Sequence, residues 1–152
     1  MTGVTFIELL GMALRIEKES IHFYRRAVQL LKDEESIRLT DALAREEEEH
    51  YKKIVQLQKT IGDDEISAGK GIQIEIDDQG ALFSSPDIAE CALPEEILES
   101  AIQREKETER LYEKFLGTEN LPHHWEKLFV YLKDQEKTHA FRLGAILHRG
   151  EN

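Results

Sequence analysis

Three places in the sequence carry the spacing Glu-x-x-His, which can present a carboxylate and an imidazole to the same atom. The three pairs are Glu19 with His22, Glu47 with His50, and Glu136 with His139. On a helix, residues three apart lie about one turn along the same face, so such a pair can bind one metal ion. The spacing is weak evidence by itself, because chance gives roughly one match in a chain so rich in glutamate.

An internal repeat distinguishes between the three pairs. Residues 13–24 align with residues 101–112 at an offset of 88, with five identities in twelve positions, and residues 43–50 align with residues 132–139 at an offset of 89. A bundle with approximate twofold symmetry leaves such a repeat in its sequence. The pairs at His50 and His139 match each other, whereas the pair at His22 has no counterpart, because Arg110 stands at the equivalent position.

The repeat adds two glutamates, Glu17 and Glu105, at equivalent positions of the two halves. They fall within apolar stripes of predicted helices, as the two matching pairs do. Glu19 lies about 200° around the helix from Glu17, so we expect it in solvent. The predicted cluster therefore holds four carboxylates and two imidazoles: Glu17, Glu47, His50, Glu105, Glu136 and His139.

Four buried carboxylates need compensation, since alone they would cost many kcal/mol and would take up protons. Two divalent cations balance the four charges. Oxygen ligands with one nitrogen per metal suit iron or manganese, and zinc also accepts such a site. We expect two metal ions, iron first, with Glu47 and Glu136 bridging them, Glu17 and Glu105 as terminal ligands, and one histidine on each ion. The alternative is six charged residues on ordinary helix faces.

Two tyrosines are candidates for supporting this cluster. Tyr24 and Tyr112 follow Glu17 and Glu105 by seven residues, two turns along the same helix face. Each hydroxyl could hydrogen-bond a ligand carboxylate from a neighbouring helix, which would orient that ligand and tune the metal. Ordinary core tyrosines are the alternative interpretation.

The elements that must position these residues are four helices, predicted at about residues 5–31, 34–61, 94–116 and 122–149. Their apolar residues recur at spacings of three and four. Their ends carry the residues typical of helix ends: a Thr5 to Glu8 capping box, Asp33, Gly62, Pro94 and Gly117. Short connections make each consecutive pair an antiparallel hairpin. The predicted fold is all-α, an antiparallel four-helix bundle forming a single domain over residues 1–152.

The connection at residues 62–93 joins the two hairpins and breaks the helical pattern. It is long enough to cross the whole bundle, since an extended chain of this length reaches roughly 100 Å. Ile72, Ile74 and Ile76 alternate with polar residues, which favours a short strand or hairpin at about residues 71–83. Such a strand could also pair with a second subunit.

Composition narrows the functional class. A net charge of −11 argues against nucleic acid or an anionic membrane as partner. The sequence contains no long apolar run typical of a membrane span and no signal-peptide pattern, so we expect a cytoplasmic protein. The single cysteine, Cys91, excludes an intramolecular disulfide and a thiolate metal cage.

Over most of its length the chain resembles the rubrerythrin branch of the ferritin-like superfamily. The resemblance rests on Glu17 with Tyr24, Glu105 with Tyr112, and the two matching Glu-x-x-His pairs. It implies a diiron four-helix bundle, dimeric or larger, that reacts with hydrogen peroxide or dioxygen in defence against oxidative stress. It also implies an external electron donor such as a rubredoxin-like protein.

Two departures from the rubrerythrin pattern bear on the reaction. The sequence lacks the paired Cys-x-x-Cys ligands of a rubredoxin domain, and Ile102 stands where rubrerythrin has a further glutamate one turn before Glu105. Two other functions therefore stay open. One is iron handling, by ferroxidase activity or storage, and the other is a metal-stabilised structural or sensor protein without turnover.

Overall fold

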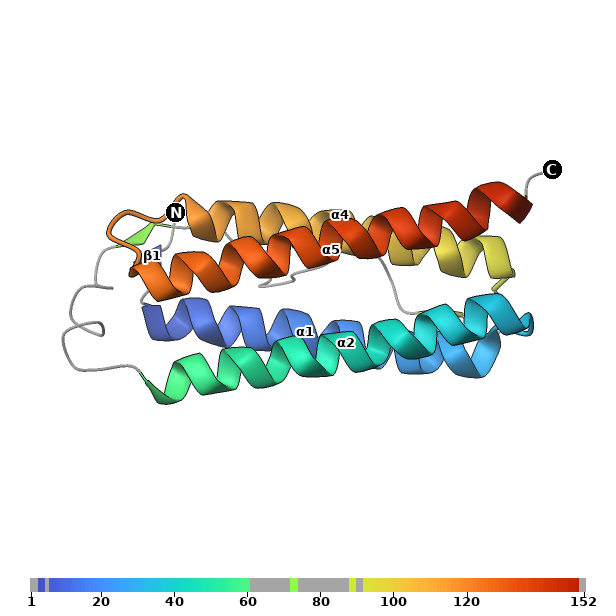
Figure 1. The fold of residues 1–152 in the computed structure, drawn as a ribbon, viewed down its shortest axis with the longest axis horizontal. Coiled ribbons are helices and arrows are strands. Elements are labelled where there is room, and N and C mark those ends of the chain that lie inside the picture. The colour runs from blue at the N-terminus through green and yellow to red at the C-terminus, as the bar shows by residue number, and fades with distance from the viewer. Residues whose placement is uncertain (1–2, 5, 61–71, 74–87, 90–91, 151–152) are drawn as a thin grey trace.

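The computed structural model describes residues 3–4, 6–60, 72–73, 88–89 and 92–150. Within them, four long helices lie side by side along one axis (Figure 1). They are α1 (Phe6–Leu30), α2 (Glu34–Lys59), α4 (Pro94–Leu116) and α5 (His123–Gly150). The predicted all-α, antiparallel four-helix bundle is confirmed, and each expected helix boundary lies within about two residues of the observed one.

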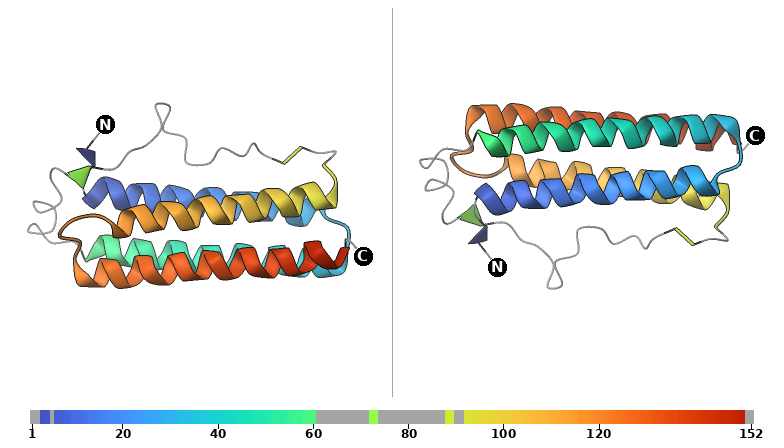
Figure 2. Two further views of the ribbon diagram at one scale, coloured as in Figure 1. Left: turned by 90° about the horizontal axis from the view of Figure 1, so that it is seen from above. Right: turned by 90° about the horizontal axis from the view of Figure 1, so that it is seen from below.

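The bundle consists of two helical hairpins. The closest packing is between α1 and α2 and between α4 and α5. Views from above and below show α1 beside α4 in one layer and α2 beside α5 in the other (Figure 2). This pairing places the two halves of the sequence repeat face to face.

The helix ends confirm several of the predicted stop and start signals. The Asp33 carboxylate accepts a hydrogen bond of 2.9 Å from the Ser36 N–H at the start of α2. Pro94 is the first residue of α4, and Gly117 is the C-cap residue that directly follows its last residue, Leu116. The expected capping box at Thr5 and the expected stop at Gly62 fall on residues outside the described ranges.

A two-stranded antiparallel sheet accompanies the helices. β1 (Gly3–Val4) pairs with β2 (Ile72–Gln73), with Gly3 opposite Gln73. A strand does occur within the predicted range of 71–83, and its partner is the segment before α1. The remainder of that predicted range, residues 74–83, lies outside the described part of the chain.

Two large apolar clusters fill the bundle on either side of its middle, and a third, smaller one contains Ala27, Leu31 and Ile97. One packs large aromatic rings, including Phe6, Phe115, Trp125 and Phe129, and the other contains Leu43, Ala44, Leu98, Ala101 and Leu143. Phe141 and Leu143 are two apolar residues on α5 that point in different directions. Leu143 is buried and Phe141 is 78% exposed. Leu143 lies four residues after His139 and shares its face, whereas Phe141 is displaced by about 200°.

Candidate metal centre

The six predicted ligands lie together in the middle of the bundle, between the two apolar clusters. None of them is more than 2% exposed. α1 and α4 each contribute one glutamate, and α2 and α5 each contribute a Glu-x-x-His pair. Each side chain points inward because it falls within the apolar stripe of its helix.

The six residues form two overlapping groups, in each of which the potential ligand atoms lie within 4.8 Å of one another. The first group is Glu17, Glu47, His50 and Glu136, and the second is Glu47, Glu105, Glu136 and His139. Glu47 and Glu136 belong to both groups, which is the position that a carboxylate between two metals would take. Glu17 and Glu105 each belong to one group, as expected for terminal ligands.

Each histidine faces the carboxylates with the same ring nitrogen. His50 Nδ1 lies 3.1 Å from Glu136 Oε1 and 3.6 Å from Glu17 Oε2. His139 Nδ1 lies 2.9 Å from Glu47 Oε1 and 3.6 Å from Glu105 Oε1. The two imidazoles stack with centroids 5.8 Å apart and planes within 7° of parallel. Nδ1 is therefore the nitrogen of each ring that faces the carboxylate cluster.

Many polar atoms of the cluster make no hydrogen bond. These atoms are both carboxylate oxygens of Glu47 and of Glu136, Oε2 of Glu17 and of Glu105, and Nδ1 of both histidines. Burying a charged oxygen without a partner costs several kcal/mol. A cation contacting these atoms would remove that cost, and four carboxylates match the charge of two divalent ions. The donor set thus fits a dimetal centre.

The pKa values of the shared glutamates reflect this crowding. Burial raises the pKa of Glu47 well above its ordinary value, and the charges of Glu136 and Glu17 raise it further. Burial and the neighbouring Glu105 likewise raise the pKa of Glu136. Without metal these carboxylates hold protons more strongly than carboxylates in water do.

The pKa of Glu105 shifts in the opposite direction to those of Glu47 and Glu136. Burial raises its pKa, but interactions with Glu136, His139 and Tyr24 outweigh burial, so the pKa lies below its ordinary value. Glu105 is thus the more readily ionised member of its group.

The two tyrosines connect the two halves of the bundle. The Tyr112 hydroxyl donates a hydrogen bond of 2.6 Å to Glu17 Oε1, and the Tyr24 hydroxyl donates one to Glu105 Oε1. Burial and the nearby carboxylates raise the pKa of both hydroxyls, which keeps them protonated as donors. The hydrogen bonds expected from Tyr24 and Tyr112 to carboxylates on a neighbouring helix are therefore present, while their role in supporting metal ligands stays a prediction.

The remaining Glu-x-x-His pair lies outside the cluster, as predicted. His22 is exposed, and Glu19 forms an ion pair of 3.3 Å with Arg15 on the surface of α1. The motif alone could not have separated this pair from the other two, and the repeat did.

Two neighbours of the cluster were missed by sequence reasoning. Arg104 is buried with its guanidinium 4.6 Å from the centroid of the Phe23 ring. Arg142 on α5 forms an ion pair of 2.9 Å with Glu46 on α2. The repeat could have indicated that Arg104 is buried, because the aligned residue 88 positions earlier is the apolar Ile16.

The Rubrerythrin family model matches residues 8–147, a range that contains all six clustered residues and both tyrosines. The chain belongs to the rubrerythrin family. The family is ferritin-like and usually binds two metal ions, in agreement with the donor set described above.

A solved structure supports the fold of this rubrerythrin-family chain. A hypothetical protein from Pyrococcus furiosus superposes with a TM-score of 0.69, covering 93% of this chain and 87% of its own, at 21% identity. That similarity concerns the fold alone. No curated protein matches the sequence significantly. Among the described helices, none is long and apolar enough to cross a membrane.

Proposed function

We propose that this rubrerythrin-family chain holds two metal ions, iron first, with manganese or zinc as other candidates, and reduces hydrogen peroxide or dioxygen with them. An external donor such as a rubredoxin-like protein restores the electrons. The observation that carries the proposal is the set of buried oxygens of Glu47 and Glu136, which lack hydrogen bonds and belong to both ligand groups.

Each residue has a role within this proposal. Glu17 with His50 serves one metal position, Glu105 with His139 serves the other, and Glu47 and Glu136 serve both. When bound, two ferrous ions supply the two electrons that, with two protons, convert one hydrogen peroxide into two waters. Tyr24 and Tyr112 hold the terminal carboxylates in place, and the apolar clusters exclude water from both sides along the bundle axis.

Metal analysis tests the binding step. Protein purified without added metal and then loaded anaerobically with Fe²⁺ should hold two ions per chain. Glu47→Ala and His139→Ala should each lower that number, because each removes a buried ligand. Glu49→Ala is the matched control, since Glu49 is exposed on the same helix and pairs with Lys52. Two ions retained by both ligand variants would contradict the proposed site.

Rapid mixing tests the reaction. The diferrous protein is mixed without oxygen with one equivalent of peroxide, and separately with dioxygen, and oxidation of the iron is followed optically. We expect oxidation within seconds by at least one of them. If neither oxidises the iron, a structural or sensor role replaces the enzymatic one.

Particle size separates the enzymatic proposal from iron storage. A homodimer in the cytoplasm is part of the proposal, whereas storage requires a closed shell of many chains. Sedimentation of the purified protein distinguishes a dimer from a shell, and a shell would favour iron handling.

A further inference from the structure

We propose that the two metal positions are inequivalent, because the Glu46 carboxylate, held by Arg142, supports the His139 imidazole from behind and His50 has no such support among the described residues. The inference rests on the proposed dimetal centre and adds Glu46 and Arg142 as positioning residues. They would act through His139 without contacting a metal.

The imidazole of His139 offers one nitrogen to the carboxylates and the other to Glu46. Its Nε2 is buried and makes no hydrogen bond, and Glu46 Oε1 lies 3.9 Å from it. Glu46 is partly exposed, so a small rotation of its side chain can bring the oxygen within hydrogen-bonding distance. A ligating imidazole that donates its second N–H to a carboxylate is oriented by it and becomes a more basic ligand.

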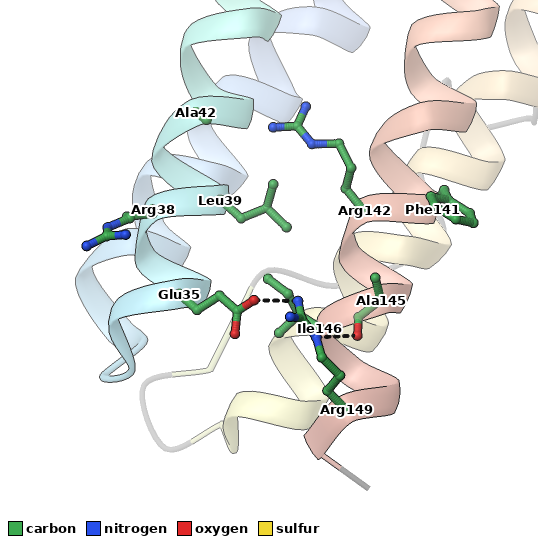
Figure 3. A pocket seen from close by; sticks show the side chains of 9 residues that line it. All are labelled: Glu35, Arg38, Leu39, Ala42, Phe141, Arg142, Ala145, Ile146 and Arg149. Carbon is green, nitrogen blue, oxygen red and sulfur yellow. Dashed lines mark hydrogen bonds and ion pairs between the residues drawn. The ribbon is translucent and has the colours of Figure 1, made fainter.

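Arg142 fixes the Glu46 carboxylate at this place. Its Nη1 donates to both oxygens of Glu46, at 3.2 Å and 2.9 Å. Arg142 follows His139 by three residues on α5, so it lies one turn along the same helix. Figure 3 shows its side chain extending from α5 toward α2, at the level of Ala42, in a groove between the two helices. This ion pair bridges α2 and α5 and keeps the Glu46 carboxylate beside His139.

The other half of the bundle lacks this arrangement. At the repeat offset of 89, Gln135 is the counterpart of Glu46 and Lys53 is the counterpart of Arg142. The carboxylate is thus replaced by a neutral amide. Lys53 Nζ instead lies 5.3 Å from the centroid of the Tyr131 ring.

An aromatic ring takes the place of a carboxylate beside His50. The Tyr131 ring meets the His50 ring edge-on, with centroids 5.9 Å apart and planes at 81°. At the repeat offset of 89, Ala42 is the counterpart of Tyr131. Ala42 and Arg142 line the same groove, so no aromatic ring from the described part of the chain takes this position near His139 (Figure 3). One imidazole therefore has an anion behind it, and the other has an aromatic ring with a cation above it.

The expected consequence is stepwise metal binding. Removing a carboxylate behind a ligating histidine typically lowers metal affinity by about 10- to 100-fold. The position that contains His139 and Glu105 should therefore fill first, and the position that contains His50 and Glu17 should fill second.

Calorimetric titration of the full metal-free chain with Co²⁺ under a competing chelator tests this order. The wild type should bind two ions in two resolved steps. Glu46→Gln should weaken the first step by roughly 10-fold or more and leave the second unchanged. Glu49→Gln is the matched control, because it removes the same charge one turn further along α2, from an exposed side chain, and should leave both steps unchanged.

Single-site backgrounds assign the affected position. In His50→Ala the surviving position contains His139, so adding Glu46→Gln should weaken it; in His139→Ala the same addition should change nothing. An equal effect in both backgrounds, or an equal effect of Glu49→Gln, would show a general charge effect and overturn the inference. A wild type that binds fewer than two ions would instead contradict the proposed function, and thermal melts of each variant confirm folding.

Discussion

The aromatic end of the bundle and its charged middle are buried to the same degree but differ in how they affect stability. At the end, Trp125 packs against Phe6 with ring centroids 5.0 Å apart, and the apolar surface of the rings there gains from leaving water. In the middle, four carboxylates share one buried space with oxygens that make no hydrogen bond. The first region stabilises the chain by itself, and the second costs free energy that a bound cation would offset. The bundle can therefore fold around a site that is unfavourable without its ligand.

The largest expected effect of a single substitution comes from the aromatic end. Trp125→Ala should lower the free energy of unfolding by about 3–5 kcal/mol, because it leaves a cavity beside Phe6 and loses buried apolar area. Chemical denaturation with and without metal measures this loss. The two conditions should show the same loss, since Trp125 belongs to the aromatic cluster and to neither ligand group.

Phe141→Ala is the control for that substitution. Phe141 lies on the same helix and is 78% exposed, so its loss should change stability by less than about 0.5 kcal/mol. A Trp125→Ala variant that lost stability only when metal is bound would contradict the separation of the two regions.

The second prediction is a gain in the free energy of unfolding when metal binds to the charged middle of the bundle, and no substitution is needed to measure it. At a free metal concentration 100 times the dissociation constant, each occupied position should add about 2.7 kcal/mol to the free energy of unfolding. Melting the wild type with and without Co²⁺ shows the gain. Glu136→Ala, which removes a ligand shared by both groups, should lose most of it. An unchanged gain in this variant would place the metal elsewhere.

The sequence predicted the six residues of the central cluster better than it predicted the residues that surround them. The six clustered residues follow from the repeat, because equivalent positions on four amphipathic helices must converge. The tyrosine hydrogen bonds follow from their two-turn spacing. The Glu46 and Arg142 pair does not follow, since it depends on how α2 and α5 approach each other and breaks the symmetry that identified the ligands.

The small sheet was only half predictable for a similar reason. The alternating isoleucines indicated a strand near Ile72, but its partner is Gly3–Val4, about 70 residues away in sequence. A two-residue strand carries too little pattern to specify a distant partner. Pairing between such segments is decided by where the helices place them in space.

The third prediction concerns the two tyrosine hydrogen bonds that connect α1 and α4. Tyr112→Phe removes the donor to Glu17 and leaves a buried carboxylate oxygen without a partner, at a cost of about 1–3 kcal/mol in the metal-free protein. Tyr24→Phe should do the same for Glu105. Thermal melts measure both. In metal titrations, each variant should weaken one of the two binding steps, and Tyr51→Phe, at a partly exposed tyrosine outside the cluster, should weaken neither.

The last prediction concerns Glu47→Gln. This substitution should change the free energy of unfolding in opposite directions in the metal-free and the metal-loaded protein. Burial raises the folded-state pKa of Glu47 above its ordinary value, so the folded chain binds more protons than the unfolded chain between those two values. The metal-free wild type should therefore lose stability as pH rises through that window, by up to about 1.4 kcal/mol per pH unit for one group.

Glutamine cannot ionise, so Glu47→Gln should flatten this part of the pH profile and make the metal-free protein more stable than the wild type at neutral pH. The same substitution should destabilise the metal-loaded protein, because it removes a charged ligand shared by both groups. Denaturation series from pH 5 to pH 8 with chelator and with Co²⁺ would show the two opposite changes. A loss of stability in both series would mean that Glu47 stabilises the fold directly, as Trp125 does, and that the middle of the bundle needs no cation.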